Sequence, residues 1–299
     1  MPELPDLTVY VEQLTPRIVG EVFEGVRLAS PFLLRTATPP LRAAEGKRVV
    51  GVRRIGKRIV IELQDDLFVV LHLMIAGRLH WREHGKPIQG KVGLAAFDFS
   101  SGTLLLNEAS PKKRAALYLV QGKEGLAEYD RGGLEVLGAS VDDFRSRLLA
   151  GNHTLKRALT DPDLFAGIGN AYSDEILWRA RMSPVKLTRS LEEGEVQRLY
   201  EATQSILTEW IDRLRQDTGE GWPEKVTAFR KEMAVHGKYN QACPTCGSRV
   251  QRIVHAENES NYCPTCQTGG KLLADRALSR LLKADWPRTL EEMEQRKRA

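Results

Sequence analysis

CPTCGSRVQRIVHAENESNYCPTC, residues 243–266, is the stretch that decides how the C-terminal part of this chain folds. It contains all four cysteines of the sequence in two Cys-x-x-Cys pairs, Cys243 with Cys246 and Cys263 with Cys266, which sixteen residues separate. Each pair can direct two thiolates at one metal ion while the intervening residues form a β-hairpin. Four sulfur ligands favour tetrahedral zinc and leave no open coordination position, so we predict one structural zinc ion. Redox-active or free thiols are the alternative.

Helical patterns precede this stretch, from residue 141 to about residue 216. Within them, FAGIGNAYSDE at residues 165–175 interrupts the helical run with Gly167 and Gly169 and restarts it at Asn170, a preferred N-cap residue. The pattern predicts a helix, a break of two turns and a second helix. Exposed backbone amides at such a helix start can bind a phosphate group, and Lys156 would help if it lies beside the break. Ordinary punctuation between two helices is the alternative.

Toward the N-terminus, the period of the hydrophobic residues changes from that of helices to that of strands. Seven short β-rich runs, separated by turn-forming residues, lie at residues 26–30, 47–55, 57–63, 67–73, 94–99, 103–107 and 115–120. We predict a sandwich or barrel of mostly antiparallel strands. An amphipathic helix over residues 7–19 precedes the strands and would hold the N-terminus in place. Its apolar face contains Leu7, Val11, Leu14 and Ile18.

The chain is long enough for two hydrophobic cores, with 299 residues of which 42% are hydrophobic. We predict an α+β protein of four parts: a β-rich domain over residues 1–122, a helical domain over 138–232, the cysteine finger over 233–267 and a helical tail over 268–299. The tail either packs on the body or binds a partner. Its expected helix, which ends near Trp286, contains Leu272, Leu273, Leu278, Leu281 and Leu282.

The charge balance and the N-terminus limit the choice of partner and compartment. A net charge of +5 is compatible with a polyanionic partner but does not require one. The sequence has no run of eighteen apolar residues, and Glu3 and Asp6 stand where the apolar core of a signal peptide would begin. We therefore expect a cytoplasmic protein without a membrane partner.

The first residues, MPELPD, suggest a reactive N-terminus. If Met1 is removed, Pro2 presents a secondary amine, and α-amino groups have pKa values of about 7.7–8.0, whereas a lysine amine has about 10.4. A usable fraction of such an amine is neutral near pH 7 and can attack a sugar carbon to form an iminium, or Schiff base. Glu3 is placed to move protons. The alternative is that a proline at position 2 has no special role.

Four segments together resemble the formamidopyrimidine-DNA glycosylase and endonuclease VIII family in identity, order and spacing. They are MPELPD at residues 1–6, RIGKRIVIEL at 54–63, FAGIGNAYSDEIL at 165–177, and CPTCG with YCPTCQ at the end. The resemblance implies an N-terminal β-sandwich, a helix-two-turn-helix domain and a zinc finger. It also implies a monomeric, bifunctional enzyme that flips a damaged base out of double-stranded DNA, cleaves its glycosidic bond and nicks the strand by β-elimination.

The resemblance assigns roles to individual residues. Pro2 takes the role of the nucleophile and Glu3 that of the proton donor, while Lys57 serves the lyase step and binds phosphate. Asn170 takes the role of a phosphate contact, and Lys156 that of a further DNA contact.

Departures from the family pattern concern the residues that contact DNA. Asp6 replaces the usual glutamate. Ile75, in HLMIAG, stands where an apolar residue fills the hole left by the flipped base, and Lys113 and Arg114 lie in a loop without its usual aromatic residue. Asn258 occupies the position of a family arginine that helps the second elimination. Neutral Asn258 cannot neutralise phosphate, so we expect β-elimination and leave completion of δ-elimination open; Arg249 or Arg252 could substitute.

A non-catalytic module that binds damaged DNA is the competing hypothesis, because such a protein could keep the scaffold and lose the chemistry. The combination of Pro2, Glu3 and Lys57 favours the enzyme, since a binding module does not need these three residues. The sequence does not indicate whether the lesion is an oxidised purine, an oxidised pyrimidine or a bulky or crosslinked adduct.

Overall fold

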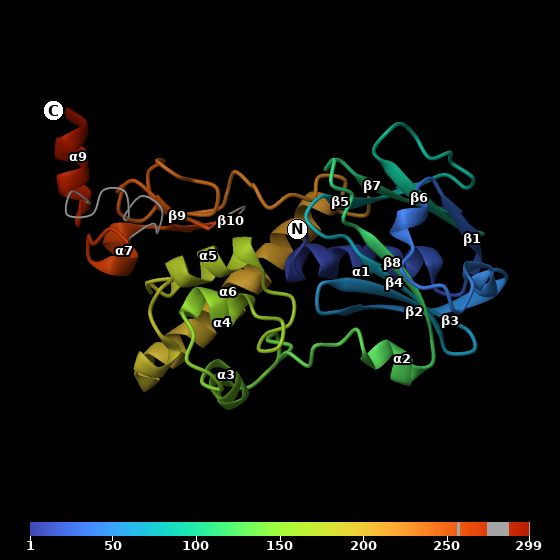
Figure 1. The fold of residues 1–299 in the computed structure, drawn as a ribbon, viewed down its shortest axis with the longest axis horizontal. Coiled ribbons are helices and arrows are strands. Elements are labelled where there is room, and N and C mark those ends of the chain that lie inside the picture. The colour runs from blue at the N-terminus through green and yellow to red at the C-terminus, as the bar shows by residue number, and fades with distance from the viewer. Residues whose placement is uncertain (256–257, 274–286, 299) are drawn as a thin grey trace. The chain divides into compact units, whose positions relative to one another are not determined.

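The computed structural model describes residues 1–255, 258–273 and 287–298, which form two compact units (Figure 1). The first contains Met1–Gly133 together with Glu209–Thr227, and the second contains Leu134–Thr208 together with Ala228–Ala299. The first boundary, after Gly133, falls in the glycine-rich stretch 122–138. The four-part division expected from the sequence stays a prediction.

Helix α1 (Leu4–Ile18) opens the first unit and begins three residues earlier than predicted. Two reciprocal hydrogen bonds fix its start: the Glu3 side chain accepts from the backbone of Asp6, and the Asp6 side chain accepts from the backbone N–H of Glu3 at 3.0 Å. The shorter carboxylate of Asp6 therefore still closes the capping box. The N-terminal residues are held by this cap and by the buried face of the helix.

The strands of the first unit form one continuous antiparallel arrangement in the order β5-β7-β6-β1-β2-β3-β4-β8. Their bounds are β1 (Val22–Leu28), β2 (Lys47–Ile55), β3 (Arg58–Leu63), β4 (Leu67–His72), β5 (Gly77–Arg82), β6 (Gly93–Phe99), β7 (Gly102–Glu108) and β8 (Ala116–Gln121). The two four-stranded halves are joined only by a short β1–β2 pairing, Val22 with Arg48 and Phe23 with Lys47. Strand β5 was not predicted, although its sequence GRLHWR alternates polar and apolar residues as a strand does.

One hydrophobic core lies between these two halves, which confirms the predicted sandwich and excludes a barrel. Both halves contribute buried side chains to it, including Ile59 and Leu71 from one half and Phe97 and Leu104 from the other. Helix α1 contributes a stripe at helical spacing to the same core, formed by Leu7, Tyr10, Leu14 and Ile18.

The remaining elements of the first unit include α2 (Lys123–Ala127), short 3-10 helices at Pro31–Leu33 and Leu41–Ala44, and the returning segment 209–227. In that segment the Trp222 indole N–H donates to the carbonyl of Leu79 at 2.7 Å. Arg215 forms an ion pair with Glu12 of α1 at 2.6 Å.

The second unit contains the predicted helices, α3 (Val141–Leu148), α4 (Leu155–Thr160), α5 (Asn170–Arg179) and most of α6 (Glu193–Thr218), with a short 3-10 helix at Thr188–Ser190. The helix-two-turn-helix pattern is present as α4, residues 161–169 and α5. One detail of the prediction is wrong: Gly169 is the N-cap of α5, without a side-chain cap, and Asn170 is the first helical residue. The side chain of Asn170 therefore does not cap the helix.

The finger follows, with strands β9 (Gln251–His255) and β10 (Asn258–Tyr262) in an antiparallel hairpin and α7 (Pro264–Thr268) after it. Leu272 and Leu273 do not start a helix as predicted. Instead, Leu272 N–H donates to the carbonyl of Arg288 at 2.9 Å, so this part of the tail is extended. An additional helix, α9 (Leu290–Arg298), was not predicted. The predicted positions Leu278, Leu281, Leu282 and Trp286 lie outside the described residues. Within the described part of the chain, none of the helices combines the length and apolar character needed to cross a membrane.

Candidate functional site

The N-terminal residues of the first unit lie in a buried, charged environment. Pro2 is buried and Glu3 is 3% exposed. The pKa of the Met1 amino group is lowered, mainly by burial and further by the positive charges of Arg78 and Lys57, while Glu3 and Asp6 act in the opposite direction. An amine at this end of the chain is thus kept neutral at a lower pH than an exposed one. The structure brings three predicted residues, Pro2, Glu3 and Lys57, into one neighbourhood.

Lys57 lies in the tight turn between β2 and β3, and the register of the sheet places His72 beside this turn. Arg58, the residue after Lys57, pairs directly with His72 at the end of β4. Burial lowers the pKa of His72 to about 4, helped by the positive charges of Arg58 and Lys57. His72 is therefore a neutral imidazole near pH 7. It was not singled out from the sequence, because its environment depends on strand pairing.

The segment after β4 is a tight turn that exposes Ile75. The backbone N–H of Gly77 donates to the carbonyl of Leu73 at 2.9 Å, and Met74 has a φ of 51°, in the left-handed region. A Cβ atom at Gly77 would lie 2.3 Å from the Leu73 carbonyl oxygen, so the turn requires glycine there. Ile75 is 51% exposed, so this turn presents its apolar side chain to solvent.

The loop with Lys113 and Arg114 lies next to this turn, because Gly77 pairs with Glu108 in the β5–β7 register. Glu108 is 1% exposed and holds the loop: its carboxylate accepts from the backbone N–H of Arg114 at 2.9 Å and of Ala115 at 3.0 Å. The Lys113 ammonium donates to the carbonyl of Glu108. Lys113 is thus partly engaged, while the Arg114 side chain is exposed.

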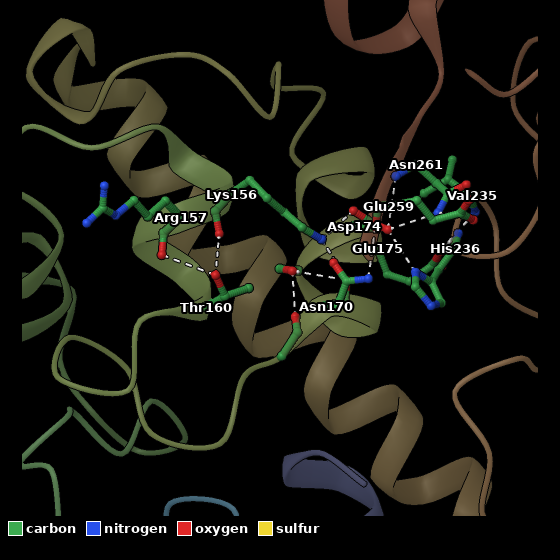
Figure 2. Close-up of polar contacts among 12 residues, drawn as sticks. Lys156, Arg157, Thr160, Asn170, Asp174, Glu175, Val235, His236, Glu259 and Asn261 are labelled. Carbon is green, nitrogen blue, oxygen red and sulfur yellow. Dashed lines mark hydrogen bonds and ion pairs between the residues drawn. The ribbon is translucent and has the colours of Figure 1, made fainter. Parts of the chain in front are cut away.

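In the second unit, the helix-two-turn-helix brings Lys156 and Asn170 together (Figure 2). The Lys156 ammonium donates to the backbone carbonyl of Asn170 at 2.7 Å and to a carboxylate oxygen of Asp174 at 2.5 Å. The Asn170 side-chain amide donates to the carbonyl of Glu259 in the finger strand β10 at 2.9 Å. Lys156 therefore lies beside the break, where it could help to bind a phosphate.

The two carboxylates of α5, those of Asp174 and Glu175, are buried and have partners within the second unit. Asp174 is fully buried and also contacts His236, whose Nδ1 atom lies 2.8 Å from it. Glu175 accepts backbone N–H groups of three consecutive residues, Ala234, Val235 and His236, at 2.8–2.9 Å. Burial raises the pKa of Glu175, and these three hydrogen bonds partly offset that effect. Neither carboxylate faces outward to repel a phosphate. Asp174 and His236 were not recognised from the sequence as a pair.

The four cysteine Sγ atoms lie within 4.8 Å of one another. Cys243 and Cys266 are 3.9 Å apart, and Cys246 and Cys263 are 3.4 Å apart. Zinc–sulfur bonds of about 2.3 Å in a tetrahedron would place sulfur atoms roughly 3.8 Å apart, so the four thiols fit one zinc ion. They would hold it as a closed structural site.

The finger side chains that could approach phosphate differ in their exposure and in the contacts that they make. Asn258 is exposed at the start of β10. Arg252 forms an ion pair with Glu259 at 2.9 Å and lies over the Tyr239 ring at 4.3 Å, while Arg249 donates to the carbonyl of Asn240 at 3.2 Å. Both arginines therefore already have partners within the finger.

Three family models match the chain in sequence order. They are the formamidopyrimidine-DNA glycosylase N-terminal domain over residues 1–113, the formamidopyrimidine-DNA glycosylase H2TH domain over 137–219, and the zinc finger found in FPG and IleRS over 240–269. The tail after residue 269 lies beyond these matches.

Individual relatives agree with these matches. The formamidopyrimidine-DNA glycosylase of Heliobacterium modesticaldum is 32% identical over 89% of this chain and 100% of its own length. The structure of Lactococcus lactis Fpg with DNA containing an abasic site has a TM-score of 0.78 at 26% identity, covering 89% of this chain and 99% of that one. The structure of MutM with DNA containing carbocyclic 8-oxo-G has a TM-score of 0.77 at 28% identity, covering 89% and 100%.

Proposed function

The chain belongs to the formamidopyrimidine-DNA glycosylase family and is a zinc-finger DNA glycosylase of base excision repair, and from this we propose that it is a bifunctional glycosylase and abasic-site lyase with Pro2 as nucleophile. The observation that supports this most is the buried N-terminal neighbourhood: Pro2 and Glu3 are buried, and burial together with the positive charges of Arg78 and Lys57 lowers the pKa of the amino group that begins the chain here, that of Met1. A neutral amine is the nucleophilic form.

The reaction then follows in two stages. The Pro2 nitrogen attacks C1′ of the damaged nucleotide, and the bond from C1′ to the base breaks while the departing base takes up a proton for which Glu3 is the donor. The bond from C1′ to the ring oxygen O4′ then breaks, the proton of the Pro2 nitrogen passes to O4′, and C1′ and the nitrogen become joined by a double bond. The resulting iminium withdraws electrons and acidifies the 2′ protons. Loss of one of these protons drives β-elimination, in which the C3′–O3′ bond breaks and the strand is nicked. Lys57 supports this second stage, and neutral His72 beside it can accept or donate a hydrogen bond.

The same proposal assigns DNA contacts. Lys156, Asn170 and Arg114 hold phosphates, and the exposed Ile75 fills the space that the flipped base vacates. Asn258 is a neutral contact at the finger. We further propose that the enzyme acts as a monomer in the cytoplasm on damaged double-stranded DNA, with the four predicted domains as its functional parts.

Reduction with borohydride in the presence of abasic-site DNA tests this function. The wild-type protein, with removal of Met1 verified by intact mass, should form a covalent adduct, and Pro2→Gly should lose it almost completely while still binding the duplex. Pro87→Gly, at an exposed proline of the same unit, is the matched control and should react normally.

Binding without any adduct from a wild-type protein that lacks Met1 would identify a non-catalytic module. Duplexes with an abasic site and with 8-oxoguanine are the first substrates to test, because the structural neighbours were solved with such DNA.

A further inference from the structure

A single buried carboxylate, that of Asp174, connects three separate segments of the second unit (Figure 2). One of its oxygens accepts from the Lys156 ammonium of α4 at 2.5 Å. The other lies 2.8 Å from Nδ1 of His236, and accepts from Asn261 of β10 through the backbone N–H at 3.1 Å and the side-chain amide at 3.3 Å. Helix α4, the segment around His236 and strand β10 thus meet at one residue of α5.

Because these side chains are removed from solvent, each depends on the others for its hydrogen bonds. The side chains of Asp174, His236 and Lys156 are 0%, 4% and 13% exposed. A buried carboxylate is tolerated only when it is paired and hydrogen-bonded, and removing one partner leaves the others as poorly solvated polar groups. The neighbouring carboxylate, Glu175, uses its oxygens on backbone N–H groups and so does not compete for Lys156.

The Lys156 ammonium has three N–H donors. Two of them are used, one on Asp174 and one on the carbonyl of Asn170. Because these two acceptors fix the end of a side chain that otherwise samples many rotamers, the third N–H has a defined direction close to the start of α5. A phosphate bound there would meet a lysine whose conformation is already fixed before binding.

We propose that Asp174 is a positioning residue for DNA binding: it holds Lys156 in place for a backbone phosphate and couples this contact to the finger through His236 and Asn261. The inference rests on the proposed role of Lys156 at a phosphate. The opposite arrangement, in which Asp174 competes with the phosphate and restrains Lys156, predicts that removal of its charge tightens binding. The two alternatives therefore differ in the sign of one measured effect.

The experiment measures the Kd for a duplex with a tetrahydrofuran abasic analogue at several salt concentrations. The proteins are wild type, Lys156→Met, Asp174→Asn and the double variant. Asp142→Asn is the matched control, because it makes the same charge change at a carboxylate that is 80% exposed on α3. Zinc content and thermal unfolding are recorded for each protein, so that only folded, zinc-loaded samples are compared.

Asp174→Asn should weaken binding about tenfold and reduce the slope of log Kd against log salt by about one, as expected when one phosphate contact is lost. Lys156→Met should do the same, and the double variant should add almost nothing, because both changes remove the same contact. Asp142→Asn should bind like wild type.

If Lys156→Met weakens binding but Asp174→Asn binds as well as wild type or more tightly, the positioning role is wrong. If Lys156→Met itself has no effect, the proposed phosphate contact of Lys156 fails instead. If Asp174 has only a structural role, Asp174→Asn should lower stability but leave the salt slope unchanged. Its effect on Kd should then add to that of Lys156→Met in the double variant. If Asp174→Asn loses zinc or fails to fold, Asp174→Glu is measured in its place. This variant keeps the negative charge but displaces it by one methylene. Weakened binding by this variant supports the proposal, and wild-type binding overturns it.

Discussion

At the scale of single residues, the structure lowers the pKa of two titratable groups near the proposed active site, His72 and the amino group of Met1. Burial and neighbouring cations keep His72 neutral and lower the pKa of the N-terminal amine. Both shifts favour the uncharged form, which is the reactive form of the amine.

This arrangement predicts a pH dependence. The Pro2 amine must lose its proton to react, so the rate of adduct formation should rise with pH and level off once the pH exceeds the pKa of this amine. Arg78 lowers the pKa of the Met1 amino group next to Pro2, so we expect Arg78→Gln to raise the pKa of the Pro2 amine as well and to move the rising part of the pH profile to higher pH. Rates of borohydride trapping between pH 5 and 9 would measure the shift.

Lys123→Gln, at an exposed lysine of the same unit, is the control and should leave the rising part of the pH profile in place. If the rising part of the pH profile does not move in Arg78→Gln, or moves to lower pH, the assignment of the amine as the titrating group is contradicted. Thermal unfolding must accompany this test, because Arg78 also donates to the carbonyls of Val226 and Gly77.

At the scale of elements, the turn between β4 and β5 has a backbone fixed by the fold and a side chain, Ile75, that the fold does not need. Its backbone is fixed by the Gly77–Leu73 hydrogen bond and the left-handed Met74, whereas the side chain of Ile75 contributes little to the core. A half-exposed apolar residue on a rigid turn is what a base-stack contact requires.

Ile75→Ala should therefore leave stability nearly unchanged but reduce excision of a paired, damaged base about tenfold, because less of the unstacking cost of a few kcal/mol is recovered. Single-turnover excision measures this effect. Trapping on a duplex that already has an abasic site should change less, since no damaged base has to be flipped out. Val50→Ala, at a similarly exposed residue with 55% exposure on β2, should have no effect on either reaction. If Ile75→Ala reduces the rate of excision and the rate of trapping by the same factor, a role in base flipping is contradicted.

At the scale of the whole molecule, each of the two units has its own source of stability. The first has the sandwich core around α1, whereas the described part of the finger has a small buried cluster in which Val235 and Val250 pack with Cys243 and Cys263. Metal binding in such a small element is a large part of its folding free energy.

Removal of zinc by a chelator should therefore unfold the finger while the first unit keeps its structure. Trp178 provides a local reporter, because its indole N–H lies 3.4 Å from the Cys243 sulfur. Its fluorescence should change with zinc loss, and DNA binding should weaken at least tenfold. Trp178→Phe should abolish the fluorescence change but not the loss of binding. Full DNA affinity in a zinc-free protein would contradict a structural role for the metal in binding.

The sequence determined those features that depend on local spacing or on covalent order. Hydrophobic period predicted the leading helix, most strands and the helices after residue 141, and the glycines of residues 165–175 predicted the break before α5. The spacing of the cysteines predicted the metal site, because two residues between ligands are enough to direct both sulfurs at one ion. Strand β5 was not predicted although its six residues alternate polar and apolar side chains, and helix α9 was not predicted because its sequence is almost entirely polar.

Tertiary structure alone decided the features that join distant residues. Asp174 meets His236 and Asn261 across 62 and 87 residues, and no local pattern indicates that these side chains share a carboxylate. The periodicity of α6 is continuous across residue 208, so it does not show that Glu209–Thr227 packs with the first unit. Charge states follow the same rule: His72 is neutral because strand pairing buries it beside Arg58, and burial is a property of packing that spacing along the chain does not specify.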